Sequence, residues 1–174
     1  MITLIDPTIP GLRRYARSML RDRAAADDLV QDCLERAISR WHQRRDDREP
    51  RAWLFTICHN LAVNRLRETA SRGPHLSIEE APEMAFSHEA AQDQAIHCLD
   101  VVKAMNALPA EQRAVLLLVS VEDLSYAEAA EVLDIPLGTV MSRLSRARSR
   151  LRSELAASET VPPADTAVRL RRVK

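Results

Sequence analysis

The chain is 174 residues long, with a formal net charge of zero, three glycines and 3% aromatic residues, a composition that predicts a small all-α protein. No apolar run approaches the roughly 18 residues that cross a bilayer, and the N-terminus lacks a secretory signal pattern, which argues against a membrane-spanning or exported protein. Three widely spaced cysteines without a CxxC motif exclude a disulfide framework, so we expect a reduced, cytosolic protein.

Charge is unevenly distributed along the chain. Residues 1–72 carry 14 basic and 10 acidic residues, whereas residues 73–100 carry six acidic residues and no Lys or Arg. In residues 101–157 the two signs balance, yet five of the seven bases lie between Arg143 and Arg152. The neutral total therefore conceals two basic surfaces and an acidic connector.

Three helices are predicted within residues 1–72, which form a first small domain. They run through 12–20, from about 24 to 41, and from Pro50 to the Gly73-Pro74 break. The wholly polar segment 42–49 predicts a loop between the second and third helices. Apolar residues at helical spacing define the expected buried stripes, which are Val30, Cys33, Leu34, Ala37, Ile38 and Trp41, then Trp53, Leu54, Ile57, Leu61 and Leu66.

A linker and a second domain follow. Residues 73–87 hold two prolines, scattered apolar residues and acidic charge, which predicts a flexible acidic linker. Residues 88–157 predict the second helical domain, and residues 158–174 a disordered tail. Ser87 can cap a helix that ends at Leu108, and Pro109 opens the next helix. The inward residues expected in the first of these helices are Ala95, Ile96, Leu99, Val102 and Met105.

Segment 125–151 has the layout of a helix-turn-helix motif. Ser125 and Glu128 form a capping-box pattern at the start of a short helix, and the turn 133–136 (LDIP) precedes a longer helix. The longer helix, from Gly138 to Leu151, has two unlike faces. Val140, Leu144, Ala147 and Leu151 form an apolar stripe, while Thr139, Arg143, Arg146 and Arg150 repeat the same spacing on another face, widened by Arg148 and Arg152.

The basic face of this longer helix predicts DNA contact. Five arginines and no acidic residue lie between Arg143 and Arg152, and a helix with a buried back can place such side chains in a DNA major groove. The alternative is a helical hairpin whose arginine face is merely solvated. The absence of acidic residues from the face disfavours this alternative.

A second basic surface is predicted around the polar loop and the third helix. Asn60, Asn64 and Arg67 share one face of that helix, and such side chains reach both base edges and phosphates. The loop also contains three acidic residues, so a plain polar loop is nearly as well supported. The complete set is His42, Arg44, Arg45, Arg48, Arg51, His59, Asn60, Asn64, Arg65 and Arg67.

Catalytic and metal-binding functions are not indicated by the sequence. It has no Ser/His/Asp grouping, no glycine-rich phosphate loop and no HExxH motif, so we expect neither an enzyme nor a bound cofactor or metal. Cys33, Cys58 and Cys98 lie on or beside apolar stripes and are expected to be buried; a thiol-based switch is a weakly supported alternative. An acidic face, which taken alone is a solvated surface, is formed by Asp28, Gln31, Asp32 and Glu35.

Two groups of motifs resemble a known protein family. Segments 28–32 (DLVQD) and 51–60 (RAWLFTICHN) resemble the sigma-2 domain of extracytoplasmic-function (ECF) sigma factors of RNA polymerase. Segments 108–113 (LPAEQR), 125–130 (SYAEAA) and 138–148 (GTVMSRLSRAR) resemble the sigma-4 domain. The two independent motif groups occur in the family's order and spacing, which makes the resemblance specific.

The resemblance implies an alternative sigma factor built from a sigma-2 domain (1–72), a linker (73–87) and a sigma-4 domain (88–157). Such a protein binds core RNA polymerase as a monomer in the cytoplasm, directs promoter-specific initiation, and is held inactive by an anti-sigma factor, which in some cases is membrane-bound. Its sigma-4 domain leans on the β flap of the polymerase. The linker would thread the RNA exit channel.

The resemblance also assigns residues to three contacts. The clamp helices of the β′ subunit would be bound through Asp28, Gln31, Asp32 and Glu35. The minus-10 element would be read through Arg45, Arg48, Asn60, Asn64 and Arg67. The minus-35 element would be read through Thr139, Ser142, Arg143, Arg146 and Arg150. The two elements lie roughly 50–60 Å apart along the duplex, a distance that an extended linker of 15–25 residues can span.

The sequence departs from the family pattern at three positions. Met141 stands where Lys or Arg is common, which removes one expected phosphate or base contact. Asp134 stands where Gly usually closes the preceding helix, and Asp tolerates the left-handed conformation at some cost. Asn64 stands where Asp is usual.

Two other functions fit parts of the pattern. A sigma-like domain can serve as a decoy that sequesters an anti-sigma factor, although the retained basic face and the lack of an accompanying receiver domain argue against a decoy. A free-standing dimeric helix-turn-helix regulator would instead bind a palindromic site without polymerase.

Overall fold

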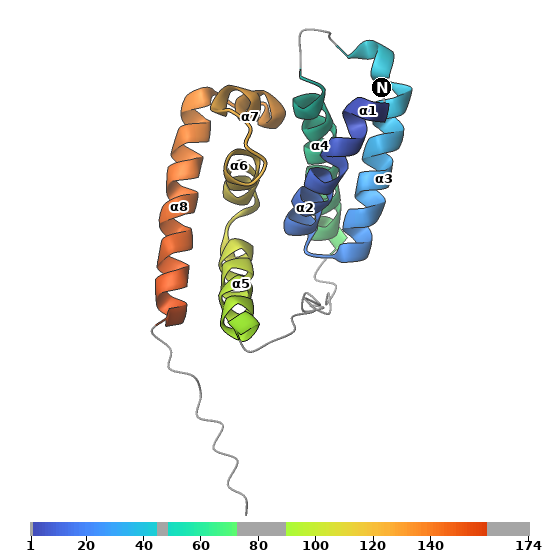
Figure 1. Ribbon diagram of the computed structural model, residues 1–174. Helices are drawn as coiled ribbons and strands as arrows, with labels where there is room; N and C mark the ends of the chain where they lie inside the picture. Colours follow the sequence, from blue (N-terminus) through green and yellow to red (C-terminus); the bar gives the residue numbers. More distant parts are fainter. Residues whose placement is uncertain (1, 45–48, 73–89, 160–174) are drawn as a thin grey trace, which may run out of the picture.

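The computed structural model describes residues 2–44, 49–72 and 90–159, and within these ranges it contains helices and no strand. No helix in those ranges combines the length and apolarity needed to cross a membrane. The helices form an N-terminal half (residues 2–72) and a C-terminal half (residues 90–159) that lie side by side (Figure 1). The all-α prediction is confirmed. The predicted linker (73–87) and residues 160–174 of the predicted tail lie outside the described residues.

The elements follow in chain order. The N-terminal half consists of α1 (Ile2–Ile5), the 3-10 turn η1 (Asp6–Thr8), α2 (Ile9–Leu20), α3 (Arg23–Ser39), the 3-10 turn η2 (Trp41–Gln43) and α4 (Pro50–Arg72). The C-terminal half consists of α5 (Ala90–Ala107), α6 (Ala110–Ser120), α7 (Tyr126–Leu133) and α8 (Leu137–Glu159).

Helices α2, α3 and α4 pack against one another in the N-terminal half. Arg21, in the left-handed conformation at φ 59°, follows the end of α2, and Asp22 then caps α3 by accepting a hydrogen bond from the Ala25 amide at 2.9 Å. The largest fully buried side chains of this half are Leu12, Tyr15, Met19, Leu29, Leu54 and Phe55. The predicted third helix is confirmed as α4, which begins at Pro50.

The second predicted helix differs from the expectation at its C-terminal end. Helix α3 ends at Ser39, and Trp41 begins the separate turn η2. Ile38 is 53% exposed, so its predicted inward position was wrong. Adjacent side chains on a helix point about 100° apart, and burial of Ala37 therefore turns Ile38 towards solvent.

Helix α6 is central to the C-terminal half, where α7 and α8 pack against it. Its six residues from Arg113 to Leu118 are all buried. The predicted capping box is confirmed, because Ser125 Oγ accepts from the Glu128 amide at 3.2 Å and Glu128 Oε2 accepts from the Ser125 amide at 2.8 Å. Asp134 adopts φ 51° after α7, as the turn requires, and α8 then continues beyond its predicted end.

Helix α5 buries a different stripe from the one predicted. It packs along α8 through Ala104, and Leu108 is buried just after its end. Leu99 and Val102 are 36% and 42% exposed, so their predicted inward positions were wrong. At 100° per residue, these two side chains point about 140° and 160° away from Ala104. Met105 is half-buried, and the side chains of Ala95 and Ile96 lie outside the described part of the structure.

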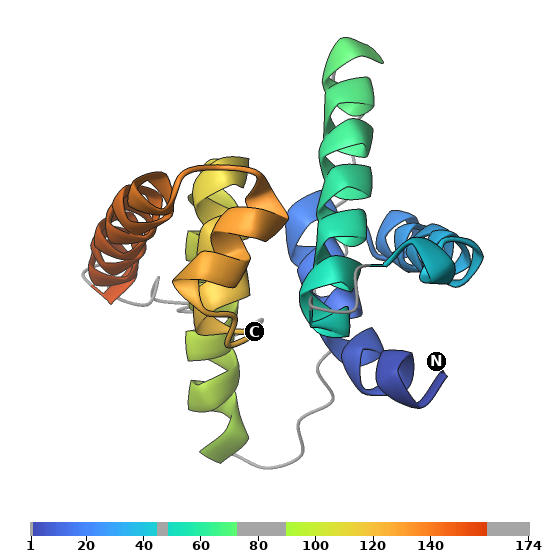
Figure 2. The ribbon, with the colours of Figure 1, turned by 90° about the horizontal axis from the view of Figure 1, so that it is seen from above.

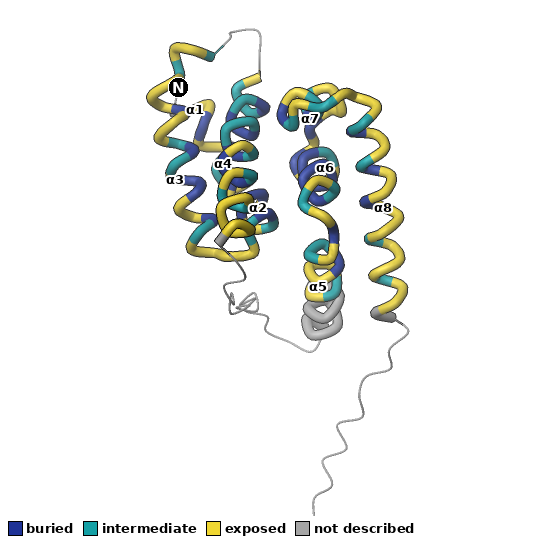
Figure 3. The backbone as a smooth tube through the Cα atoms, turned by 180° about the vertical axis from the view of Figure 1, so that it is seen from behind, coloured by how far each residue is buried: buried dark blue, intermediate teal, exposed yellow. Residues whose placement is uncertain are grey.

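The two halves pack directly against each other, an arrangement that the sequence pattern did not predict. Helix α7 lies against α4 and α6 lies against α2 (Figure 2). Buried apolar residues of both halves belong to one continuous cluster. Exposed positions gather on the outward sides of α3 and α8 (Figure 3). The promoter-reading candidates on α4 and α8 must therefore be considered within one packed unit.

Candidate nucleic-acid interface

Helix α8 has the two faces that its sequence predicts. Val140, Leu144 and Ala147 are at most 2% exposed and fix the helix against the rest of the C-terminal half. On the opposite side Arg146 and Arg150 are exposed. The apolar stripe thus anchors the helix and leaves a cationic face in solvent, which suits contact with the phosphates and base edges of a major groove.

Arg143 differs from the other arginines of α8. Its side chain is 26% exposed and its guanidinium forms an ion pair with the Glu111 carboxylate of α6 at 2.7 Å. Thr139 is half-buried and its carbonyl accepts a hydrogen bond from the exposed Ser142 hydroxyl at 3.1 Å. The predicted minus-35 residues therefore share one helix, but Arg143 already has an acidic partner.

Helix α4 presents a polar face next to the N-terminal half's core. Asn60, Asn64 and Arg67 are all exposed, as the shared spacing predicts, while Leu61 and Ala62, which lie between the two asparagines, are buried. The face is therefore available to an extended polyanion or to unstacked bases. Two further candidates for the same contact, Arg45 and Arg48, lie outside the described residues.

Arg65 does not belong to this basic surface, contrary to the sequence-based grouping. It points to α3, where it pairs with the Asp32 carboxylate at 2.7 Å and donates to the Ala25 carbonyl at 2.6 Å. Asp28, Gln31 and Glu35 are exposed on α3, with the Gln31 amide donating to Glu35 at 3.2 Å. The acidic face of α3 is thus open except at Asp32.

The two tryptophans support the start of α4 from the side of η2. Trp41 and Trp53 are half-buried and pack edge to face with ring centroids 5.9 Å apart. The Arg44 guanidinium lies over the Trp41 ring, 5.2 Å from its centroid. This packing agrees with the predicted core role of the tryptophans and holds η2 against the start of α4.

His59 lies where the two halves meet. Its Nδ1 is hydrogen bonded to the Tyr15 hydroxyl at 2.7 Å. Burial, and to a smaller extent the positive charge of Arg143, lowers the pKa of His59 to about 4, so the imidazole is neutral at pH 7. Arg143 is on α8 and His59 is on α4, so a charge of the C-terminal half acts on a histidine of the N-terminal half.

Cys33 and Cys58 are buried free cysteines in the core of the N-terminal half. A hydrogen bond between Cys58 and Cys33, together with burial, raises the pKa of the Cys58 thiol well above its usual value. A buried thiol that stays protonated is a poor nucleophile. The prediction that these two cysteines act as small core residues is confirmed, and the side chain of Cys98 lies outside the described residues.

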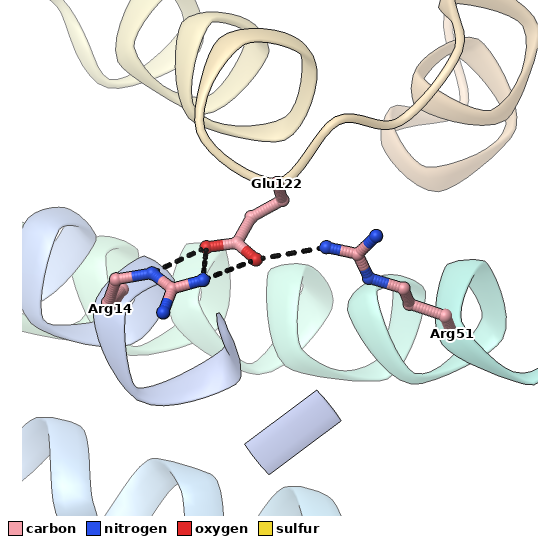
Figure 4. A network of polar contacts seen from close by, with 3 residues as sticks. All are labelled: Arg14, Arg51 and Glu122. Atoms are coloured by element: carbon pink, nitrogen blue, oxygen red, sulfur yellow. Dashed lines mark hydrogen bonds and ion pairs between the residues drawn. The ribbon is translucent and has the colours of Figure 1, made fainter. Parts of the chain in front are cut away.

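A buried carboxylate joins the two halves. Glu122, in the loop between α6 and α7, has a side chain that is 1% exposed. Its oxygens accept from Arg14 of α2 at 3.1 Å and from Arg51 of α4 at 3.2 Å (Figure 4). Sequence reasoning missed this cluster. Arg51 was grouped with the basic loop, and nothing local to segment 121–125 (VEDLS) distinguishes Glu122 from Asp123.

Comparison with known proteins identifies the family. The sigma-2 domain of PhyR matches residues 5–59, and sigma-70 region 4 matches residues 98–151. The ECF RNA polymerase sigma factor EcfG of Rhodopseudomonas palustris (strain TIE-1) is 32% identical over 91% of this chain and 87% of its own length. The RNA polymerase sigma-E factor of Streptomyces coelicolor is 35% identical over 86% of this chain and 82% of its own length. The chain belongs to the ECF sigma factors.

Solved structures agree with this family and with the two-domain fold. The sigma factor RpoE of Bartonella quintana, in complex with the anti-sigma factor NepR, is 30% identical, with a TM-score of 0.69 over 86% of this chain and 92% of that chain. CnrH, in complex with the cytosolic domain of CnrY, is 26% identical, with a TM-score of 0.66 over 89% of this chain and 86% of that chain.

The family models cover the candidate residues of this ECF sigma factor unequally. The region 4 match includes α6, α7 and all five minus-35 candidates on α8. The sigma-2 match includes the acidic face of α3 but ends at His59. Asn60, Asn64 and Arg67 lie just beyond the matched segment. Their assignment to the minus-10 contact is supported by their exposure and by the sequence resemblance.

Proposed function

We propose that this ECF sigma factor binds core RNA polymerase in the cytoplasm and directs promoter-specific initiation by reading a minus-10 and a minus-35 element. The observation that carries the proposal is the two-sided packing of α8 in a capped helix-turn-helix. Its apolar side is buried at Val140, Leu144 and Ala147, and its opposite side exposes Arg146 and Arg150. A rigidly held cationic helix of this kind fits a DNA major groove.

The proposed minus-35 contact uses the N-terminal two thirds of α8. Arg146 and Arg150 are exposed and can bind phosphates or guanine without rearrangement, whereas Arg143 must exchange the Glu111 carboxylate for DNA. Met141 is 49% exposed at a position that is commonly basic in the family. An apolar side chain there supports contact with a thymine methyl group rather than with a phosphate.

The proposed minus-10 contact uses the exposed face of α4. Asn60 and Asn64 offer amide groups that can pair with base edges, and Arg67 offers a phosphate contact one turn further on. We include Arg45 and Arg48 in this contact from the sequence. Capture of an unstacked base by such a face offsets part of the cost of melting, which is a few kcal/mol per base.

The proposed polymerase contact uses the acidic face of α3. Asp28, Gln31 and Glu35 are exposed on this helix. Asp32 contributes while it remains paired with Arg65, which holds the carboxylate in place. The similar sigma factor RpoE is described in complex with the anti-sigma factor NepR, and this sigma factor would likewise be controlled by an anti-sigma factor.

Run-off transcription with purified core polymerase tests the proposal. The sigma factor and core enzyme are incubated with fragmented genomic DNA of the source organism, and transcripts are mapped to their start sites. We expect transcripts that depend on the added chain and that begin downstream of a shared two-part sequence. No chain-dependent transcript, despite binding to core polymerase, would reject the proposal.

A second candidate function is sequestration of an anti-sigma factor. The sigma-2 domain that matches residues 5–59 is that of PhyR, and the PhyR of Bartonella quintana is described as an anti-anti-sigma factor. A decoy has no need of a cationic DNA-reading face, and the exposed Arg146 and Arg150 therefore favour the transcription factor. Binding to an anti-sigma factor without any transcription would favour the decoy.

A further inference from the structure

The contact between the two halves is centred on one buried acid. Glu122 reaches from the α6–α7 loop into the space between Arg14 and Arg51, and its carboxylate accepts two hydrogen bonds from Arg14 and one from Arg51 (Figure 4). The side chains of the two arginines are 55% and 41% exposed, whereas that of Glu122 is 1% exposed. Burial of an unpaired carboxylate is strongly unfavourable, so Glu122 can be buried here only while both arginines face it.

Gly11 provides the space that this carboxylate occupies. It lies in the first turn of α2, and a methyl group at this position would collide with Glu122 Oε2 and approach Phe55 Cζ at 3.3 Å. Glycine within a helix is less favourable than alanine by about 0.5–1 kcal/mol. The helix itself would favour alanine at this site. Glycine is instead explained by the contact between the halves, because it leaves room for the Glu122 carboxylate.

Two further arginines join the halves at the other end of α2. The buried Arg113 of α6 donates to the Ser18 carbonyl at 2.9 Å, and Arg21 donates to the Asn106 carbonyl. Each guanidinium crosses from one half to a backbone carbonyl of the other. Such bonds fix the relative position of the halves more strictly than apolar packing alone.

The packed arrangement is incompatible with contact to both promoter elements. In it α7 lies against α4, and the Arg143 charge is close enough to His59 to lower the pKa of that imidazole. Helix α8 in turn packs on α7, so the two proposed reading surfaces are held in one packed unit with α7 between them. Each packed pair of helices is about 8–10 Å apart, so α4 and α8 are held roughly 16–20 Å apart, whereas the two elements are separated by roughly 50–60 Å along the duplex.

We propose that the contact of Glu122 with Arg14, Arg51 and the space at Gly11 is an autoinhibitory latch that holds this sigma factor closed in the absence of polymerase. The closed form keeps the α4 and α8 surfaces together in one packed unit, so promoter binding requires the latch to open. That the latch holds the two halves together follows from these contacts alone. That it inhibits the protein rests on the proposed promoter-reading function.

Small-angle X-ray scattering of the full chain tests the latch. Glu122→Lys places a third positive charge between Arg14 and Arg51, and Gly11→Ala places a methyl group where the carboxylate lies. Both variants are expected to have a larger radius of gyration than the parent, with an unchanged far-UV circular dichroism spectrum. Asp123→Asn, which removes an exposed charge from the neighbouring residue, is the matched control and is expected to scatter like the parent.

The size of the effect follows from the bonds that are lost. Each hydrogen bond to a charged group stabilises the closed form. Its loss should shift the equilibrium between the closed and open forms roughly ten- to a hundredfold towards the open form. Glu122→Gln keeps the side chain's size and removes only its charge, so it and Gly11→Ala carry the test if Glu122→Lys does not fold. An unchanged radius of gyration in the folded variants would overturn the proposal.

Run-off transcription at limiting core polymerase separates the latch from the proposed function. Gly11→Ala is expected to give several-fold more transcript than the parent, because less binding energy is used to open the chain. An expanded variant that transcribes no better than an active parent would contradict the inhibitory role. Expanded variants in a chain that never transcribes would reject the proposed function and leave the latch supported.

Discussion

The arginines of α8 share a sequence pattern but not an environment. Arg146 and Arg150 are exposed, whereas Arg143 is held by Glu111 and lies near His59. Spacing on a helix identifies residues that point the same way, but it carries no information about which of them meet an acidic partner from another helix. We therefore expect the three side chains to contribute unequally to promoter binding.

Arg146→Ala should weaken use of the minus-35 element. Loss of one base or phosphate contact of this kind costs about 1–3 kcal/mol, so the affinity of the polymerase–sigma complex for a promoter should fall roughly ten- to a hundredfold. The measurement is fluorescence anisotropy with a labelled promoter fragment. Arg152→Ala, at an arginine outside the proposed contact, is the control and should have a smaller effect. If Arg146→Ala instead abolished binding to core polymerase, its assigned role would be wrong.

His59 should make the folded state sensitive to acid. Its pKa is about 4 in the folded chain and about 6.5 when unfolded, so between these values the unfolded chain binds more protons. The free energy of unfolding is therefore unaffected by this group above pH 6.5 and falls as pH decreases towards 4, by at most about 3 kcal/mol. Urea unfolding at a series of pH values between 7.5 and 4.5 measures this dependence.

His59→Gln provides the matched variant for the pH measurement. Glutamine retains a hydrogen-bonding partner for the Tyr15 hydroxyl but does not titrate. Its free energy of unfolding should depend less on pH than that of the parent between pH 6.5 and 4.5. Equal pH dependence in the two proteins would show that the buried imidazole is not the responsible group.

At the scale of single elements, caps and turns decide where the helix-turn-helix begins and ends. The reciprocal bonds of Ser125 and Glu128 start α7, and the left-handed Asp134 ends it before α8. These features were predicted because they depend on residues three or four apart in the sequence. The wrong positions of Ile38, Leu99 and Val102 have the opposite origin, since they depend on which neighbouring helix covers a face.

Ser125→Ala should destabilise the C-terminal half. It removes the acceptor for the Glu128 amide, and loss of an N-cap costs about 1 kcal/mol. For a chain of this size the melting temperature should fall by about 2–4 °C in differential scanning calorimetry. Ser149→Ala, an exposed substitution within α8, should leave the melting temperature unchanged or raise it slightly. Equal melting temperatures for the two variants would exclude an energetic role for the cap.

At the scale of the whole molecule, the predicted all-α fold agrees with the structure, but the packing of the two halves was not predicted. Glu122 and Arg14 are 108 positions apart, and their contact leaves no periodic signal in either segment. Gly11 lies just before the predicted first helix (12–20), and the Glu122 carboxylate across the interface explains why no side chain fits there. Contacts of this kind are set by three-dimensional complementarity, so local patterns cannot reveal them.

The most direct test of the central claim is a DNA footprint of the reconstituted polymerase–sigma complex on a promoter found by run-off transcription. If α4 and α8 read separate elements, two segments roughly 50–60 Å apart along the duplex should be protected. The protection should appear only when polymerase and this chain are both present. A single palindromic segment protected by the chain without polymerase would contradict the account and indicate a dimeric helix-turn-helix regulator.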